Sequence, residues 1–257
     1  MSFLEMSHVN KIYFGEKKEE VVALSDISFS CQEGEFICIV GSTGCGKTTL
    51  LRLIAGLEVP TAGEIKMAGK TVNDINQNVT MVFQQYSLFP WSNVIDNICF
   101  SFEVKGMKKN EYYEKAKELI ALVGLAGFEK AYPYELSGGM QQRAAIARAL
   151  AYDPKMLLLD EPFGALDERT RHRLQEKLLE IWQKEKKTVL FVTHNIDEAV
   201  FLANKIFIMR DRPGSIEEEI AVDLPRPRDR RSKEFIDLHI KIREILEEIL
   251  VGNSQSV

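Results

Sequence analysis

The stretch GSTGCGKT, Gly41 to Thr48, decides how the rest of this 257-residue sequence is interpreted. It fits the pattern G-x-x-x-x-G-K-[ST], in which a glycine-rich backbone surrounds phosphate groups. The apolar run Glu35–Val40 precedes it and the helix-prone segment Thr48–Leu57 follows it. The pattern therefore lies between an expected strand and an expected helix, which favours a polyphosphate site over a glycine-rich turn without a ligand.

The residue types of this stretch suit a bound polyphosphate. Gly41, Gly44 and Gly46 let the backbone wrap closely around an anion with its N–H groups pointing inward. The next helix begins with its positive dipole end aimed at that anion. Lys47 supplies a full charge to the β- and γ-phosphates, and the hydroxyl of Thr48 is a ligand for Mg²⁺. The expected nucleotide contacts are Gly41, Ser42, Thr43, Gly44, Cys45, Gly46, Lys47, Thr48 and Thr49.

A second apolar run, Met156–Leu159, ends in the acidic pair Asp160 and Glu161. At the carboxyl edge of a parallel sheet such a pair lies beside the phosphate loop. Asp160 would hold Mg²⁺ through water, and Glu161 would polarise the attacking water as general base. The alternative is a solvated acidic turn, and the apolar residues in front of the pair argue against it.

The order of the expected elements predicts an α/β fold with a parallel sheet, because strands and helices alternate in the last part of the chain. The expected strands are Val21–Cys31, Glu35–Val40, Met156–Leu159, Thr188–Thr193 and Ile206–Met209. The expected helices are Thr48–Leu57, Lys108–Val123, one starting at Ser137, Arg169–Glu185, Ile196–Ala203 and a C-terminal helix over 233–250 with an apolar docking stripe. We expect one domain, 1–257, with a helical subdomain inserted at about residues 88–153.

The composition excludes several other classes of protein. Hydrophobic residues make up 45% and charged residues 28% of the chain, which is ordinary for a globular protein. No apolar run approaches the roughly 18 residues of a membrane helix, and the N-terminus lacks a secretory signal pattern. A net charge of −5 argues against nucleic acid as a partner.

The four cysteines form no Cys-x-x-Cys pair, so we expect neither a zinc site nor disulfides but reduced thiols in a cytosolic protein. They are Cys31, Cys38, Cys45 and Cys99. Cys45 lies inside the phosphate loop. If its thiol is accessible, alkylation should inactivate the protein and nucleotide should protect it.

The segment LSGGMQQR, Leu136 to Arg143, predicts a second anion site. Ser137 has N-cap chemistry, and Gly138 and Gly139 expose backbone N–H groups at the positive end of a helix. An ordinary N-cap is the alternative for this segment taken alone. Together with GSTGCGKT and LLLDEP, however, it resembles the ATPase subunits of ABC transporters over nearly the whole chain.

The resemblance implies a P-loop NTPase (RecA-like) fold with a parallel-sheet core, an N-terminal antiparallel β part and an inserted helical subdomain. It also implies ATP with Mg²⁺ and an ATP-dependent homodimer. In that family the signature of one subunit closes over ATP held by the phosphate loop of another. Ser137, Gly138 and Gly139 would then contact the second copy's nucleotide, and Asp167 matches the loop that crosses the dimer.

Other residues match the family in chain order. Tyr13 lies where an aromatic residue stacks on adenine, with a plain strand residue as the alternative. Gln84 matches the glutamine that senses Mg²⁺ and water, and the Val-Phe-Gln order favours it over the adjacent Gln85. His194 matches the switch histidine at the γ-phosphate, although a lone histidine at a strand end is usually structural. The aromatic run Phe89–Trp91 belongs either near the membrane partner or in the core.

Within the family, the closest resemblance is to the nitrate, sulfonate and taurine importer ATPases. It rests on DEPFGALDERTRHRLQEKLLEIW, THNIDEAVFLANKIFIM, the turn Arg212–Gly214 and LPRPRDR, Leu224 to Arg230. Asn195 departs from the pattern, because Asp is more usual after the switch histidine. This resemblance implies integral membrane permease subunits, an indirect partnership with a periplasmic or extracellular solute-binding protein, and a peripheral position on the cytoplasmic face of the cell membrane.

Three alternatives remain open. The chain could serve another ABC transporter such as an exporter, act as a soluble non-transport ABC ATPase, or be an ATP-binding regulatory module that does not hydrolyse. The intact Glu161 and His194 argue against the last of these.

Overall fold

The computed structural model describes residues 2–15, 19–211 and 213–254. The chain divides into two compact units: the first combines Met1–Asn76 with Thr188–Val257, and the second is Gln77–Lys187. The expected helical subdomain, 88–153, lies within the second unit, and its boundaries stay a prediction. No helix in the described ranges has both the length and the apolar character to cross a bilayer.

An antiparallel sheet opens the first unit, with strand order β2-β1-β4-β5. Its strands are β1 (Leu4–Phe14), β2 (Glu20–Cys31), β4 (Ala62–Met67) and β5 (Lys70–Thr71). Leu4 pairs with Cys31 on one side and with Met67 on the other. The antiparallel β part that the family resemblance implied is confirmed.

The parallel strands of the first unit are largely buried, and β3 is central among them. β3 (Phe36–Gly41) pairs in parallel with β8 (Thr188–Thr193) and with β9 (Lys205–Arg210), while β10 (Ser215–Ala221) is antiparallel to β9. All six residues of β3 and of β8 are buried. Continuous apolar runs are the expected pattern for parallel strands covered on both faces.

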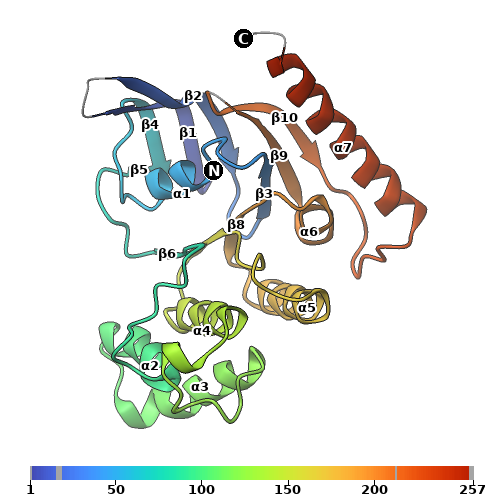
Figure 1. Ribbon diagram of the computed structural model, residues 1–257. Coiled ribbons are helices and arrows are strands. Elements are labelled where there is room, and N and C mark those ends of the chain that lie inside the picture. The colour runs from blue at the N-terminus through green and yellow to red at the C-terminus, as the bar shows by residue number, and fades with distance from the viewer. Residues whose placement is uncertain (1, 16–18, 212, 255–257) are drawn as a thin grey trace. The chain divides into compact units, whose positions relative to one another are not determined.

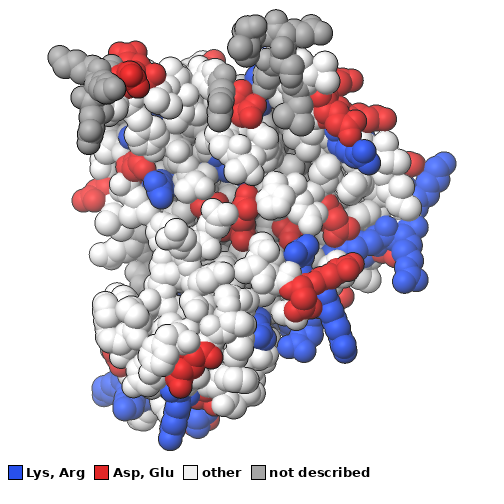
Figure 2. All heavy atoms as spheres, viewed as in Figure 1, with Lys and Arg blue, Asp and Glu red and all other residues white. Residues whose placement is uncertain are grey.

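Three helices accompany these strands: α1 (Lys47–Ile54), α6 (Ile196–Leu202) and α7 (Lys233–Ser254). α7 contacts α6 and β9 (Figure 1) and buries Phe235, Ile242 and Ile249. Its outer face is charged, with both signs mixed along it (Figure 2), and Arg243 pairs with Glu247 at 2.8 Å. The predicted docking stripe of this helix is confirmed.

The second unit is mostly helical. Its elements are β6 (Val79–Val82), α2 (Val94–Val104), α3 (Lys109–Leu122), the 3₁₀ turn Pro133–Glu135, α4 (Gly138–Ala151), β7 (Met156–Asp160) and α5 (Glu168–Glu185). β6 pairs in parallel with β7, and α4 packs against α2 and α3. The alanines of α4 are buried, and their small side chains permit this close packing.

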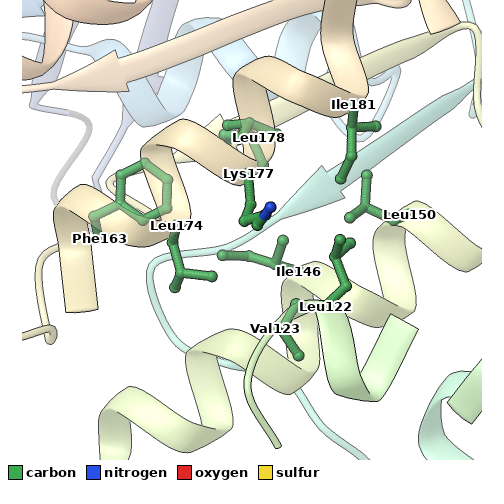
Figure 3. A pocket seen from close by; sticks show the side chains of 10 residues that line it. Leu122, Val123, Ile146, Leu150, Phe163, Leu174, Lys177, Leu178 and Ile181 are labelled. Atoms are coloured by element: carbon green, nitrogen blue, oxygen red, sulfur yellow. The ribbon is translucent and has the colours of Figure 1, made fainter. Parts of the chain in front are cut away.

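A small apolar cavity lies among α3, α4 and α5 in the second unit (Figure 3). It leaves about 10 Å³ of free space and is lined by side chains such as Leu122, Ile146 and Leu178. The labelled side chains are apolar except for Lys177, which pairs with Glu180 at 2.6 Å. An apolar void of this size is expected to stay dry, so it is a packing feature rather than a ligand site.

Most expected elements appear with small differences in their ends. The helix after the phosphate loop runs from Lys47 to Ile54 rather than from Thr48 to Leu57. It ends early because Gly56 adopts a left-handed φ of 71° and packs against the backbone of Asp74. β1, β4, β5, β6, β10 and α2 were not among the expected elements.

Candidate nucleotide site

The phosphate loop leaves β3 at Gly41 and enters α1 at Lys47. Gly44 and Gly46 have φ values of 88° and 99°, which strain residues with a side chain. Gly46 is the N-cap of α1, so no N-cap side chain competes for the first N–H groups of the helix. Strand, loop and helix are therefore arranged as the sequence motif requires, with the positive end of α1 at the loop.

Lys47 is 5% exposed and folds back on its own loop. Its Nζ donates to the carbonyl oxygens of Gly41, at 2.9 Å, and Ser42, at 2.8 Å. The backbone carbonyls of the loop therefore hold the Lys47 ammonium beside the position where a phosphate would bind. Thr43 and Gly44 are exposed at the tip of the loop.

Cys45 does not meet the condition for rapid alkylation. Its side chain is 1% exposed, and a Cβ on Gly41 would lie 2.8 Å from its Sγ. Burial raises the pKa of this thiol, and the nearby Lys47 only partly opposes that shift. Because the thiolate is the reactive form, the inactivation expected from an accessible Cys45 is not supported.

The turn after β8 carries His194 at the same sheet edge as the phosphate loop. Thr193 pairs with Val40, one residue before Gly41, and the carboxyl ends of parallel strands form the ligand-binding edge of such sheets. Thr193 Oγ1 donates to the buried Glu198 carboxylate at 2.7 Å. The structure therefore brings His194, which is exposed, and the loop together in the first unit.

Asn195 is the N-cap of α6, and its side chain accepts from the N–H of Glu198 at 3.4 Å. Its own N–H donates to Thr193 Oγ1 at 3.0 Å. Asn and Asp serve equally well as N-cap acceptors. The departure from the family pattern at Asn195 therefore leaves the turn that carries His194 intact.

Tyr13 is half-buried on β1 and is held by its hydroxyl. That hydroxyl donates to Glu58 Oε2 at 2.6 Å, and the Thr49 hydroxyl lies 3.5 Å from it. Lys11 Nζ pairs with Glu58 at 3.1 Å and lies 5.0 Å from the centroid of the Tyr13 ring. The hydroxyl contact fixes the outer end of the side chain, which leaves the aromatic ring as the part that could stack on a flat base. Glu58 belongs to no sequence motif and was therefore not among the expected site residues.

In the second unit the acidic pair lies at the carboxyl end of β7, as expected. Asp160 is 2% exposed at the end of the strand. Glu161 is the next residue and has a φ of 45°, a left-handed conformation that is costly for a residue with a side chain. Val82 pairs with Leu159, so Gln84 and Gln85, both exposed, follow at the same end of the two-stranded pair.

The signature segment begins α4 with the predicted cap: Ser137 accepts from the N–H of Met140 at 3.3 Å. A Cβ on Gly138 would lie 2.6 Å from the Tyr86 hydroxyl, and one on Gly139 would lie 3.0 Å from Leu166 Cδ2. Asp167, next to Leu166, caps α5 by accepting from Thr170 at 2.9 Å.

In the second unit, Gly138 and Gly139 of the signature segment therefore pack against Tyr86, which follows Gln84, and Leu166, which precedes Asp167. Tyr86 was missed by the sequence analysis. Its only sequence signal is its position two residues after Gln84, which does not indicate contact with Gly138, 52 positions further along.

The residues expected to hold Mg²⁺ are a hydroxyl, a carboxylate and an amide: Thr48, Asp160 and Gln84. All three offer oxygen atoms, the donors that Mg²⁺ prefers, and Asp160 is a strand-end carboxylate that is almost fully buried. The donor set fits the ion.

The comparisons with known proteins identify the family of this chain. The sequence pattern of the ABC transporter family matches residues 24–164, more than half of the chain. The chain therefore belongs to the ABC transporter family and is an ATP-binding ATPase subunit. The sequence-based assignment to this family and to the P-loop NTPase fold is confirmed.

The named relatives are similar over most of their length. An uncharacterised ABC transporter ATP-binding protein of Methanocaldococcus jannaschii is 53% identical over 95% of this chain and 91% of its own. A nitrate import ATP-binding protein of Synechocystis is 48% identical over 86% of this chain and 83% of its own. An aliphatic sulfonates import ATP-binding protein of Bacillus cereus is 46% identical over 91% of this chain and 92% of its own.

A solved structure is also similar: the dimeric post-hydrolysis state of an ATP-binding cassette bound to ADP and Pi. It has a TM-score of 0.77 and 32% sequence identity, and it covers 86% of this chain and all of that one.

Proposed function

We propose that this chain is the ATP-hydrolysing subunit of an importer for a small solute of the nitrate, sulfonate or taurine type. It would act on a separate integral membrane permease, peripherally at the cytoplasmic face of the membrane. A solute-binding protein would meet the permease and only indirectly this chain. The observation that carries the proposal is the similarity to nitrate and sulfonate import ATP-binding proteins at 46–48% identity over most of each chain.

The proposed catalytic roles rest on the motifs and on the family resemblance, and the local geometry supports them. The loop 41–49 would bind the phosphates, with the ammonium of Lys47 exchanging backbone carbonyls for β- and γ-phosphate oxygens. Glu161 would accept the proton of the attacking water as general base. His194, at the edge that carries the loop, would contact the γ-phosphate, and Tyr13 would stack on adenine.

Thr48, Asp160 and Gln84 would hold Mg²⁺, which when bound neutralises charge on the phosphates. Because the transition state needs alignment and charge compensation more than covalent chemistry, these side chains act mainly by position. Gln84 would also report the presence of the nucleotide to the rest of its unit.

Two copies of the chain would enclose two nucleotides. Ser137, Gly138 and Gly139 of one copy would present the positive end of α4 to ATP held by the other copy, and Asp167 would cross the interface. Support comes from the glycine-rich start of α4, which is the positive end of the helix, and from the dimeric form of the similar cassette. ATP would join the two copies, and hydrolysis would release them.

The test is co-purification and reconstitution of this chain with candidate permeases of the nitrate, sulfonate and taurine importer type. The complex in liposomes should hydrolyse ATP faster when its binding protein is loaded with nitrate, an alkanesulfonate or taurine on the outer side. Stimulation only by a solute on the ATPase side would indicate an exporter. Failure to co-purify with any permease would favour a soluble ABC ATPase.

A further inference from the structure

The turn between β9 and β10 lies directly against the phosphate loop. Met209 on β9 pairs with Gly41, so Asp211 follows at the level where the loop begins. Ser42 Oγ donates to Asp211 Oδ2 at 2.8 Å. The carbonyl of Ser42 also accepts from Lys47 Nζ at 2.8 Å. The first residue of the loop after β3 is therefore held at its side chain and at its backbone.

The same turn also packs against the phosphate loop at Cys45, through Gly214. A Cβ on Gly214 would lie 2.1 Å from the carbonyl oxygen of Cys45, so a side chain cannot fit there without a shift. Gly214 is fastened to β2, since its N–H donates to the Ala23 carbonyl at 3.1 Å and its carbonyl accepts from Ser25 at 2.9 Å. The turn thus connects the phosphate loop to the antiparallel sheet.

The negative charge of Asp211 also affects the nucleotide site electrostatically, in addition to its hydrogen bond with Ser42. A carboxylate beside a loop that binds phosphate opposes the anion, because like charges repel at short range. The carboxylate would therefore weaken nucleotide binding unless the order that it imposes on the loop outweighs the repulsion. Loops held in the bound shape lose less entropy when ligand arrives.

We propose that Asp211 is a positioning residue of the nucleotide site: by holding the Ser42 hydroxyl it keeps the phosphate loop in its binding shape, with Gly214 supporting Cys45 from behind. The proposal rests on the proposed phosphate-binding role of residues 41–48. The turn Arg212–Gly214 was part of the family resemblance but had no expected role, and the proposal assigns one to Gly214. Arg212 lies outside the described residues.

The test measures the affinity of a fluorescent ATP analogue with Mg²⁺ for two variants. Asp211→Ala should weaken binding about tenfold, the order expected for losing a hydrogen bond to a charged group. Asp211→Asn should restore wild-type affinity or exceed it, because its amide oxygen can still accept from Ser42 while the repelling charge is gone. In steady-state ATPase assays, Asp211→Ala should raise KM more than it lowers kcat.

A double-mutant cycle separates positioning from a general defect. Ser42→Ala should weaken binding to a similar degree, and Ser42→Ala with Asp211→Ala should be no worse than either alone. Asp223→Ala is the matched control, since Asp223 is an exposed aspartate in the same unit, and it should bind as wild type.

Three outcomes overturn the inference: additive losses in the cycle, wild-type affinity in Asp211→Ala, or equal losses in Asp211→Ala and Asp211→Asn. The first two leave the proposed site standing if Lys47→Ala loses binding in the same assay. Wild-type affinity in Lys47→Ala would instead refute the phosphate site itself.

Discussion

At the scale of single residues, Glu161 is the side chain on which hydrolysis depends. Glu161→Gln keeps the size of the side chain but removes the base, so ATP binding should persist while turnover falls by at least ~10²-fold. Single-turnover hydrolysis together with equilibrium nucleotide binding would measure both effects.

The left-handed backbone at Glu161 makes a matched control necessary. Glu176→Gln changes an exposed glutamate on α5, and this variant should hydrolyse ATP at the wild-type rate. Near-normal turnover in Glu161→Gln would show that the general base lies elsewhere.

Cys45 gives a second residue-scale prediction. Because burial raises the pKa of its thiol, the protonated form persists above the pH at which an ordinary cysteine ionises. Alkylation by N-ethylmaleimide should be slower in the folded protein than in urea, and its rate should keep rising through the alkaline range. Peptide mass spectrometry after timed labelling would measure this rate. Equal rates in the folded and unfolded chain would contradict the burial of this thiol.

At the scale of elements, the segment LPRPRDR holds the end of α6. Arg228 Nη1 donates to the carbonyl oxygens of Val200, Phe201 and Ala203 at 2.6–3.1 Å, and Arg226 donates to those of Phe201 and Leu202. Cations at a helix C-terminus bond its last carbonyls and offset its dipole. These arginines therefore fix the helix that follows His194.

Arg228→Ala should lower the free energy of unfolding of the first unit by about 2–3 kcal/mol, because buried carbonyls lose their donors. Urea denaturation followed by circular dichroism would measure the loss. Arg231→Ala, at the exposed position directly after this segment, should change it little. Equal stabilities for the two variants would rule out a structural role for the arginine contacts.

At the scale of the whole molecule, association should depend on unhydrolysed nucleotide. The Glu161→Gln variant should dimerise with ATP and Mg²⁺ but not with ADP, and sedimentation would detect the difference. Adding Gly139→Asp places a carboxylate at the positive end of α4, where it should repel the second copy's phosphates.

That double variant should bind ATP as a monomer. A dimer that formed equally well with Gly139→Asp, or without nucleotide, would contradict the sandwich in which the signature of one copy contacts the nucleotide of the other.

The fold class, the family and the expected residues of the phosphate loop could be predicted from the sequence, because those signals are local. The phosphate-loop pattern that includes Gly44, Gly46 and Lys47 is contained in eight consecutive residues. The N-cap pattern at Ser137 is contained in four. A buried strand and the helix after it are likewise visible as short periodic runs.

The contacts that support these local motifs could not be predicted from the sequence, because they join residues far apart along the chain. Asp211 lies 169 positions from Ser42, and Tyr86 meets Gly138 only because separate segments converge. The backbone of Cys45 likewise lies against Gly214, which is far away in the sequence. Such contacts depend on strand register and packing, which a short stretch of sequence does not encode, whereas loop and cap chemistry is set by neighbours along the chain.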